Sequence, residues 1–510
     1  MTMALENLKV VDLTRTLAGP FCTMMLGDMG ADVVKIEEPN HGDETRSWTP
    51  FWNGESTQFL SFNRNKRSLS INLREKESVD IVLGLASKSD VMVESFRTGA
   101  LDRMGLGYEA VRKVNPNIIY CSISGYGRTG PMADKPGYDL IIQAYSGLMS
   151  LTGDPDGEPK RVGFSLVDLF AGMLAYGCIL TALHHRQVTG KGQWIDTSLL
   201  DGQVAVMSYH GTGYLGTGVE PHRLGSGHPS LVPYQSFPGS DGSFILGCAN
   251  DGLWERLCNA MGRRDLMEDP RFKTNTDRVE HRAECVETLS QIFQENTVGH
   301  WVDLISDAGV PCGPINKVSD VVSDAQVLSR NMIVDMPHPN VPDLRVPNSP
   351  LKLTETPPSI RRPPPLLGQH NEEILKESGY TQEEMKMIWE TQKIFEDPDI
   401  MVNPTCVRVP VYLGHSEAVH LETRTKVTVP EVQDMLNSAP GVIVVDGDGP
   451  GDYPTAATEA ANRDAVFVGR IREDLSHPRG LDLWVVSDNL RKGAALNSVQ
   501  IAEILVNEFM

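Results

Sequence analysis

The chain has 510 residues, about three times the length of a typical domain, so we expect more than one domain. Apolar residues make up 40% of it and charged residues 22%, which excludes collagen-like and wholly disordered proteins. The formal net charge is −21, and the field of such a chain repels nucleic acids and anionic lipids. We therefore expect neither a nucleic acid nor a membrane as partner.

The 8 cysteines are scattered without C-x-x-C spacing, which is typical of reduced thiols rather than of a disulfide scaffold or a zinc site. Residues 1–10 include Glu6 and lack the basic stretch and apolar run of a secretory signal, so we expect a cytoplasmic protein. An apolar segment over 162–183 has Asp168 as its only charge and contains three glycines. It favours a buried helix over a membrane span.

The first 125 residues alternate short β-branched runs with helical stretches. Strands are predicted over 8–12, 32–36, 69–72, 91–93 and 118–123, and helices over 21–30 and 75–87. Strand, helix and strand at this spacing are typical of right-handed βαβ units that build a parallel sheet. The predicted fold class is α/β with Rossmann-like, doubly wound topology.

Later residues indicate further regions. Long helical segments are predicted over 139–149, 165–186 and 195–214, and a smaller α/β domain with a strand over 243–247 follows. Ten of the chain's 33 prolines lie between Pro337 and Pro365, which predicts an extended segment that can run back to the first domain. We expect a large domain over 1–220, completed by 330–385, a small domain over 221–330, a proline-rich return segment over 331–385, and a separate segment over 386–510.

The motif over 125–130 has the form G-x-G-x-x-G and follows a predicted strand. A dinucleotide-binding motif must open a helix, whereas Pro131 and Pro136 follow here. We therefore expect no NAD at this loop, although its glycines allow a substrate to approach closely. The chain also lacks a P-loop, a G-x-S-x-G elbow and a metal-binding motif, so no metal is expected.

Asp168 allows two interpretations. It lies three residues after Ser165 and before an apolar run, as the acidic residue of a capping box does. A carboxylate in this position is also held ionised by the helix dipole and partly desolvated by its apolar neighbours, which suits a nucleophile that attacks an activated carbonyl. The local pattern alone favours the cap.

Basic residues gather in the N-terminal α/β segment, several of them just after predicted strands. In a doubly wound sheet, phosphates bind at these strand ends, although isolated surface cations are common. The densest group is 64–67, and the set comprises Arg15, Lys35, Arg64, Lys66, Arg67, Arg97 and Arg103. Three histidines, His210, His222 and His228, lie in or beside the glycine-rich stretch 211–227, which is either an active-site loop or a plain surface loop.

An ordered set of motifs between about residues 5 and 380 resembles the class III CoA-transferases, the CaiB/BaiF or formyl-CoA and carnitine type. The motifs are Val11-Asp12-Leu13-Thr14, Ala18-Gly19-Pro20, Gly30 to Glu37, Asn65-Lys66-Arg67-Ser68, Asp90 to Phe96, Leu101 to Gly105, Gly137-Tyr138-Asp139 and Pro364 to Gly368. The resemblance implies an interlocked homodimer, an acyl-CoA and a carboxylic acid as substrates, and Asp168 as the residue that forms a mixed anhydride and then a thioester with CoA. With this resemblance, the nucleophile interpretation of Asp168 becomes the stronger one.

The same resemblance implies the residues that contact CoA. They are Arg15, Leu17, Asn72, Leu73, Arg74, Glu75, Phe96, Arg97, Arg103, Lys135 and Tyr138. Some members have Gln in place of Leu17 and Arg in place of Glu38. Racemases of the superfamily have a histidine base at the position of Tyr138, so transfer is favoured over racemisation. The stretch 223–234 is similar to members that act on succinyl-CoA and other dicarboxylates, and Arg223 or His228 would pair with a distal carboxylate.

The C-terminal segment from about residue 386 resembles the final third of aspartate-semialdehyde dehydrogenase. Its motifs are Asn403 to Val411, Gly414 to Glu417, Phe467 to Arg472 and Ser487 to Ala495. The resemblance implies that Arg408 and His415 match substrate-binding and acid/base residues and that Asn489 lies by the nicotinamide.

That enzyme also needs an N-terminal NADP-binding fold and a nucleophilic cysteine, and this segment has room for neither. We expect an inert remnant without NADP, joined by recombination or by an assembly error, with exposed strand edges. The alternatives are a dehydrogenase-related function of the tail, an acyl-CoA racemase, and a non-catalytic CoA-binding scaffold.

Overall fold

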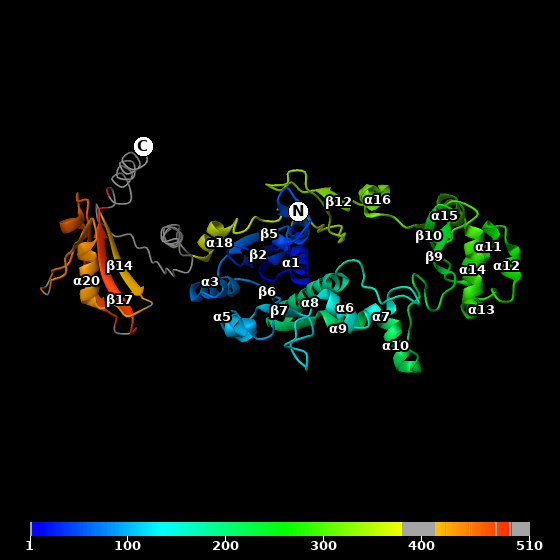
Figure 1. Cartoon of the computed structure of the whole chain (residues 1–510), viewed down its shortest axis with the longest axis horizontal. Coiled ribbons are helices and arrows are strands. Elements are labelled where there is room, and N and C mark those ends of the chain that lie inside the picture. Colours follow the sequence, from blue (N-terminus) through cyan, green and yellow to red (C-terminus); the bar gives the residue numbers. More distant parts are fainter. Residues whose placement is uncertain are drawn as a thin grey trace. The chain divides into compact units, whose positions relative to one another are not determined.

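The computed structural model describes residues 3–379, 414–423, 425–447, 449, 451–474, 477–488 and 491. The chain divides into two compact units, Met1–Pro404 and Thr405–Met510 (Figure 1). The motif Asn403 to Val411 and most of the motif Ser487 to Ala495 lie outside the described residues.

A parallel sheet forms the centre of the first unit. Its strands are β1 (Lys9–Leu13), β2 (Asp32–Glu37), β5 (Lys66–Ser70), β6 (Val91–Glu94), β7 (Ile119–Ser124) and β8 (Gln193–Ser198). They lie in the order β5-β2-β1-β6-β7-β8, and every neighbouring pair is parallel. In sequence order this is 3-2-1-4-5-6, the Rossmann arrangement, so the predicted α/β class is confirmed. The strand order reverses between β1 and β6, which is where such sheets bind ligands.

Helices cover both faces of this sheet because alternate strand residues are apolar on each face. Val10, Val33 and Val91 pack with α1 (Ala18–Asp28) and α8 (Leu166–Thr189). Their neighbours Val11 and Val34 pack on the other face with α3 (Lys76–Ser87), α5 (Tyr108–Val114) and α18 (Asn371–Ser378). Shorter elements are 3-10 helix η1 (Glu44–Ser47), β3 (Phe51–Trp52), β4 (Glu55–Ser56), α2 (Thr57–Phe62), α4 (Ala100–Arg103), α6 (Asp139–Tyr145) and α7 (Leu148–Leu151).

Helix α8 packs along α1 (Figure 1). Among the described residues it is the one helix that is long and apolar enough to cross a membrane by length and composition. Its side chains Val167, Ala171, Ala175 and Ile179 are buried in the core of the sheet. This packing agrees with the buried helix that the sequence predicts.

The helix predicted over 195–214 is partly wrong. Residues 193–198 form the edge strand β8, and only then do α9 (Leu199–Val206) and α10 (Ser208–Thr217) follow. The apolar run around Ile195 is too short to distinguish strand from helix by periodicity, and pairing with β7 decides it. The glycine-rich stretch 211–227, predicted as a loop, is helical over its first residues, because α10 includes residues 211–217.

A smaller antiparallel sheet follows, with β9 (Tyr234–Gly239), β10 (Gly242–Gly247) and β11 (Cys312–Pro314) in the order β11-β10-β9. The helices beside it are α11 (Asp251–Ala260), α12 (Arg264–Glu268), α13 (Asn275–Glu280), α14 (Arg282–Phe293) and α15 (Val298–Asp307). Phe237, Phe244 and Trp301 pack around Phe293 in their shared core.

The proline-rich segment is mostly extended after α16 (Val318–Ser323) and α17 (Ala325–Ser329), with a hairpin of β12 (Ile333–Asp335) and β13 (Arg345–Pro347). It runs back to the parallel sheet, where Asn65 exchanges hydrogen bonds with Ser359, Arg361 and Arg362. Helix α18 then packs beside β5 and α3.

The second unit has a sheet in the order β14-β17-β16-β15. Its elements are β14 (His415–Glu422), α20 (Val429–Ser438), β15 (Val442–Val444), π-helix η2 (Ala456–Ala460), β16 (Val466–Glu473) and β17 (Gly480–Ser487). Strand β14 lies at one edge among the described strands, and all of its residues except Val419 are exposed.

Candidate functional site

The predicted CoA-contact residues lie at the carboxyl ends of the parallel strands. Arg15 and Leu17 follow β1, residues 72–75 follow β5, Phe96 and Arg97 follow β6, and Lys135 and Tyr138 follow β7. Because parallel strands all end at one edge of the sheet, these loops share that edge. The sequence analysis named these residues through the family resemblance and not from their local patterns.

Two of these loops meet where the strand order reverses. The backbone N–H of Arg15 donates to Ser95 Oγ at 3.1 Å, and the Arg15 guanidinium lies 4.5 Å from the centre of the Phe96 ring. Thr98 Oγ1 donates to the carbonyl of Ala133 at 2.7 Å, and this bond joins the loop after β7 to the loop after β6. Arg15, Phe96 and the segment before Lys135 therefore form one connected surface at the switch point.

The other residues predicted to contact CoA lie in the loop after β5 and at the end of α4. Asn72 Nδ2 donates to Glu75 Oε1 at 3.0 Å, and Asn72 Oδ1 accepts from the Arg74 N–H at 3.1 Å. Leu73 lies between them, and Arg103 ends α4. Exposed cations at this edge are Arg15, Arg74, Arg97, Arg103 and Lys135. Their charges suit the phosphates of CoA.

The densest basic group of the sequence, residues 64–67, does not belong to this surface. Arg64 pairs with Asp28 at 2.7 Å, Lys66 with Asp12 at 3.0 Å and Arg67 with Asp32 at 2.6 Å, and all three cations are buried. Lys35 is likewise buried and pairs with Asp43. The expectation that these cations bind phosphate is therefore wrong, because carboxylates already neutralise them.

Asp168 lies in the first turn of α8, but the predicted capping box does not form. The Ser165 side chain makes no cap hydrogen bond. Instead Asp139 Oδ2 accepts from the N–H groups of Val167 at 2.9 Å and of Asp168 at 3.4 Å. Gln143 Nε2 holds the other oxygen of Asp139 at 2.6 Å. A buried carboxylate from α6 thus occupies the helix N-terminus that would otherwise serve Asp168.

This arrangement changes the protonation of Asp168. Burial, together with the charge of Asp139, raises the pKa of Asp168 to about 7. From the sequence we expected the helix dipole to keep this carboxyl ionised, which corresponds to a lowered pKa. The pKa is instead raised, because Asp139 takes up the N–H groups and adds a like charge. A carboxylate with few partners and a raised pKa is a stronger nucleophile than a solvated one.

Gly172 brings Asp168 to the switch point. A Cβ on Gly172 would lie 2.5 Å from the carbonyl oxygen of Ala18, so only glycine lets α8 approach the start of α1 this closely. Asp168 lies one turn before Gly172 on the same side of the helix. Asp168 therefore lies one helical turn from the contact between α8 and Ala18, the first residue of α1.

The two residues expected to bind the distal carboxylate both follow α10 in the chain, and they make separate contacts. Arg223 donates to the carbonyls of Asp154 at 3.1 Å and of Gly157 at 2.7 Å. His228 packs between Tyr209 and Tyr234, and burial, Arg282 and His210 lower its pKa. It is therefore neutral at pH 7 and offers a hydrogen bond rather than a charge.

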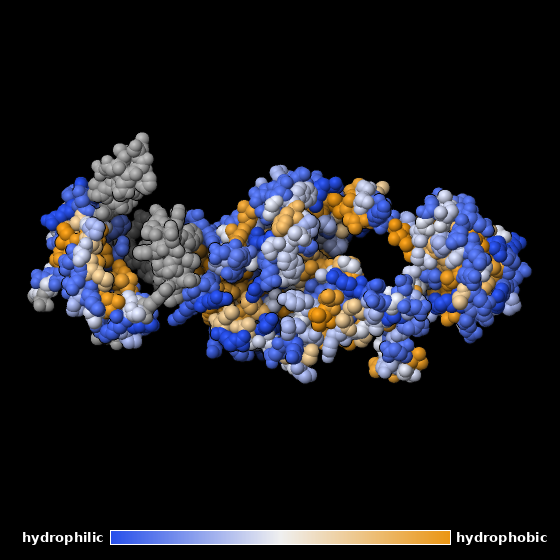
Figure 2. Space-filling model, viewed as in Figure 1, coloured by the Kyte–Doolittle hydropathy of each residue, from blue (hydrophilic) through white to orange (hydrophobic). Residues whose placement is uncertain are grey.

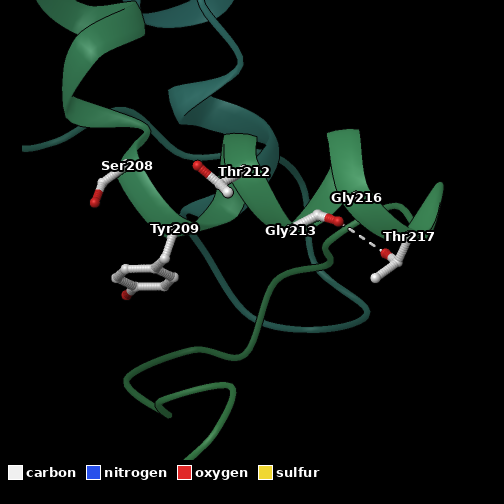
Figure 3. A pocket seen from close by; sticks show the side chains of 6 residues that line it. All are labelled: Ser208, Tyr209, Thr212, Gly213, Gly216 and Thr217. Carbon is white, nitrogen blue, oxygen red and sulfur yellow. Dashed lines mark hydrogen bonds between the residues drawn. The ribbon is translucent and has the colours of Figure 1, made fainter.

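Two hollows lie beside α10. One of about 150 Å³ is lined by residues that include His210, His222, His228 and Tyr234. The larger, of about 640 Å³, runs along α10 itself (Figure 3). It is lined by Ser208, Tyr209, Thr212, Gly213, Gly216 and Thr217, none of them charged, and Thr217 Oγ1 donates to the carbonyl of Gly213 at 2.8 Å. It contains none of the predicted site residues.

Within the described part of the chain, no group of His, Cys, Asp and Glu side chains could hold a metal ion. Of the three residues matched to the dehydrogenase site, His415 begins β14 and is exposed, whereas Arg408 and Asn489 lie outside the described residues.

Comparison with known proteins places each part of the chain. Residues 5–371 match the model of CoA-transferase family III, and residues 367–492 match the semialdehyde dehydrogenase dimerisation domain. Succinyl-CoA:glutarate CoA-transferase of Mus musculus is 47% identical over 374 residues, which are 73% of this chain and 86% of that protein. Succinate–glutarate CoA-transferase of Agrobacterium fabrum is 40% identical over 73% of this chain and 95% of its own length.

A solved structure agrees. The crystal structure of a CAIB/BAIF family protein from Brucella suis is 38% identical, with a TM-score of 0.68, and covers 74% of this chain and 100% of its own. Both resemblances predicted from the sequence are confirmed. The chain belongs to CoA-transferase family III and is an enzyme of that family, with a segment that matches the semialdehyde dehydrogenase dimerisation domain after it.

Proposed function

We propose that this enzyme transfers CoA from succinyl-CoA to another dicarboxylic acid through a covalent intermediate on Asp168. The observation that carries the proposal is the carboxyl of Asp168, which is partly buried, has a raised pKa and has the carboxylate of Asp139 as its charged neighbour. The names of the relatives from Mus musculus and Agrobacterium fabrum support the substrate class.

The steps exchange one acyl bond at a time. The Asp168 carboxylate attacks the thioester carbonyl of the donor, CoA leaves as a thiolate, and a mixed anhydride forms. The thiolate then attacks the aspartyl carbonyl, which releases the donor acid and leaves an aspartyl-CoA thioester. The acceptor carboxylate attacks that carbonyl and displaces the CoA thiolate, which gives a second mixed anhydride. The thiolate finally attacks the acceptor's acyl carbon and breaks its bond to the aspartyl oxygen. Acyl-CoA product leaves and Asp168 regains its carboxylate.

CoA would bind across the switch point. Arg15, Arg97 and Lys135 supply positive charge for its phosphates, and Phe96 supplies an apolar ring. Leu17 lies at the N-cap of α1, two residues after Arg15. We place the distal carboxylate of the acid at Arg223 and His228, since a cation and a hydrogen-bond donor there would favour dicarboxylates over monocarboxylates.

We also propose that the enzyme is a homodimer. Exposed apolar side chains surround the first turns of α6 and α8, including Tyr138 at 65% exposure and Phe164 at 54%. More gather at the tip of α10, where Leu215 is 85% exposed (Figure 2). Patches of this kind on a single chain are typical of a surface that a partner covers.

The tail has no part in this chemistry. His415 is exposed at the start of β14, and the matched segment is the dimerisation domain of a semialdehyde dehydrogenase. We propose that it is a fused remnant of a dehydrogenase. Racemisation is also disfavoured, because Tyr138 stands where a histidine base would be needed.

The test is an acceptor series. Purified full-length protein is mixed with succinyl-CoA and, in turn, glutarate, other dicarboxylates and monocarboxylates of equal length, and each new acyl-CoA is separated by chromatography. We expect transfer to dicarboxylates at least about tenfold faster than to monocarboxylates. Equal rates would overturn the dicarboxylate assignment, and no transfer to any acid would overturn the function.

A further inference from the structure

The turn between β1 and α1, residues Thr14 to Leu17, is held by side chains from outside it. The Thr14 N–H donates to Asp12 Oδ1 at 2.9 Å, the Arg15 N–H to Ser95 Oγ at 3.1 Å, and the Thr16 N–H to the Asp43 carboxylate at 3.2 Å. Three successive backbone N–H groups are thus fixed one by one. This turn carries two of the residues proposed to contact CoA.

The backbone of the turn is strained at its centre. Thr16 has a φ of 72°, in the left-handed region that β-branched residues rarely adopt. It lies directly between Arg15 and Leu17. Such a conformation persists only where surrounding contacts hold it, and the acceptor on its N–H is Asp43.

Asp43 is itself held by a buried cation. Lys35 Nζ donates to Asp43 Oδ2 at 2.8 Å and to the carbonyl of Thr14 at 2.9 Å, so one ammonium joins the carboxylate to the turn. Both side chains are fully buried. Burial alone would raise the pKa of Asp43, but the charge and hydrogen bond of Lys35 and the groups of Thr45 lower it below its ordinary value.

The turn is also packed against α1 without spare room. A Cβ on Gly19 would lie 2.3 Å from Thr14 Cβ, so the first turn of α1 sits directly on Thr14. A change in the turn therefore moves Arg15 and Leu17 relative to α1.

We propose that Asp43 is a positioning residue for CoA: its carboxylate, held by Lys35, keeps Thr16 in the left-handed conformation that presents Arg15 and Leu17 to the ligand. This rests on the proposed CoA site. Asp43 does not touch the reacting atoms, so its loss should weaken CoA binding while saturating CoA thioester still acylates Asp168.

The test compares Asp43→Asn with Asp28→Asn. Asp28 is a matched control, because it also pairs with a buried cation, Arg64, but lies at the other end of α1 and makes no bond to the turn. Free CoA is titrated calorimetrically, and KM and kcat are measured with succinyl-CoA. We expect Asp43→Asn to raise the Kd and KM by about tenfold with kcat within about twofold, and Asp28→Asn to change neither.

Equal effects of the two substitutions on KM would overturn the proposal, because any loss of a buried charge pair would then account for them. If Asp43→Asn fails to fold with Lys35 left unpaired, the double variant Lys35→Met/Asp43→Asn removes both charges, and it should show the same rise in Kd. A wild-type Kd in the folded double variant would also overturn the proposal. A wild-type protein that binds no CoA at all would instead contradict the proposed function.

Discussion

Asp43 is a buried aspartate and Asp168 a partly buried one in the same unit, and their surroundings shift their pKa values in opposite directions. Asp43 has Lys35 beside it and accepts hydrogen bonds from Thr16 and Thr45, so its pKa lies below the ordinary value. Asp168 has a second carboxylate, Asp139, as its charged neighbour, and its pKa is raised to about 7.

We propose that the difference separates a structural carboxylate, Asp43, from a reactive one, Asp168. A carboxylate whose lone pairs are all used is stable and inert, and it can hold a turn. A carboxylate deprived of partners is costly to the fold, yet its charge is free to attack a carbonyl. In this chain Asp139 accepts the hydrogen bonds of the N–H groups at the start of α8, so these donors are not available to Asp168.

The largest expected effect comes from removing the reactive carboxyl. Asp168→Asn keeps the shape of the side chain but removes the nucleophile, so we expect the transfer rate to fall by at least about 10³-fold. CoA binding, measured calorimetrically, should stay within about threefold. A variant with a rate within about tenfold of wild type would remove Asp168 from the mechanism.

Next comes the pH dependence. Only the ionised carboxyl attacks, so kcat/KM should fall about tenfold per unit below pH 7 and level off above it. Asp139→Asn removes the like charge and should shift the midpoint to lower pH by about one unit. The measurement is kcat/KM from pH 5 to 8.5 in both proteins. An unchanged midpoint in Asp139→Asn would show that Asp139 does not set the ionisation of Asp168.

A smaller effect concerns stability. Because the folded pKa of Asp168 lies above its ordinary 3.8, the folded state binds its proton more tightly, and stability is lost as pH rises from about 4 to 7. At pH 8 the full penalty remains, so Asp168→Asn should raise Tm there by about 2–4 °C. At pH 4 the difference should vanish. Thermal unfolding at both pH values checks this, and a Tm rise of equal size at pH 4 would contradict the ionisation argument.

The smallest effect is expected from the tail. A chain ending at Gly379, the last residue after α18, should retain kcat and KM within about twofold, because the proposed site lies within the first unit. Intact protein should bind no NADP in a titration followed by fluorescence. Loss of transfer in the shortened chain, or tight NADP binding by the full chain, would give the tail a function.

The sequence predicted the parallel sheet well, because β-branched runs such as 32–36 and 118–123 are buried on both faces. It missed β8, whose short run around Ile195 becomes a strand only through pairing with β7. In the site, the sequence predicted Asp168 through the family resemblance, whereas the local pattern alone favoured a helix cap. The role of Asp139 was missed, although it stands in the Gly137-Tyr138-Asp139 motif, because its contact with α8 spans 28 residues.

Charge was the least predictable property. The cluster over 64–67 resembles a phosphate site in sequence, but its partners Asp12, Asp28 and Asp32 are distant along the chain. Asp43 gave no signal of its own, since its importance lies in a single bond to the Thr16 N–H. Local sequence shows which charges are present, and the fold decides which of them are already paired.

The covalent step is the central claim, and trapping it is the most direct test. Full-length protein and Asp168→Asn are each mixed with succinyl-CoA, quenched with hydroxylamine and analysed by intact-protein and peptide mass spectrometry. We predict a hydroxamate on Asp168 in the native chain and none in the variant. Folded native protein that binds succinyl-CoA but yields no adduct, or an adduct on another residue, would contradict the account.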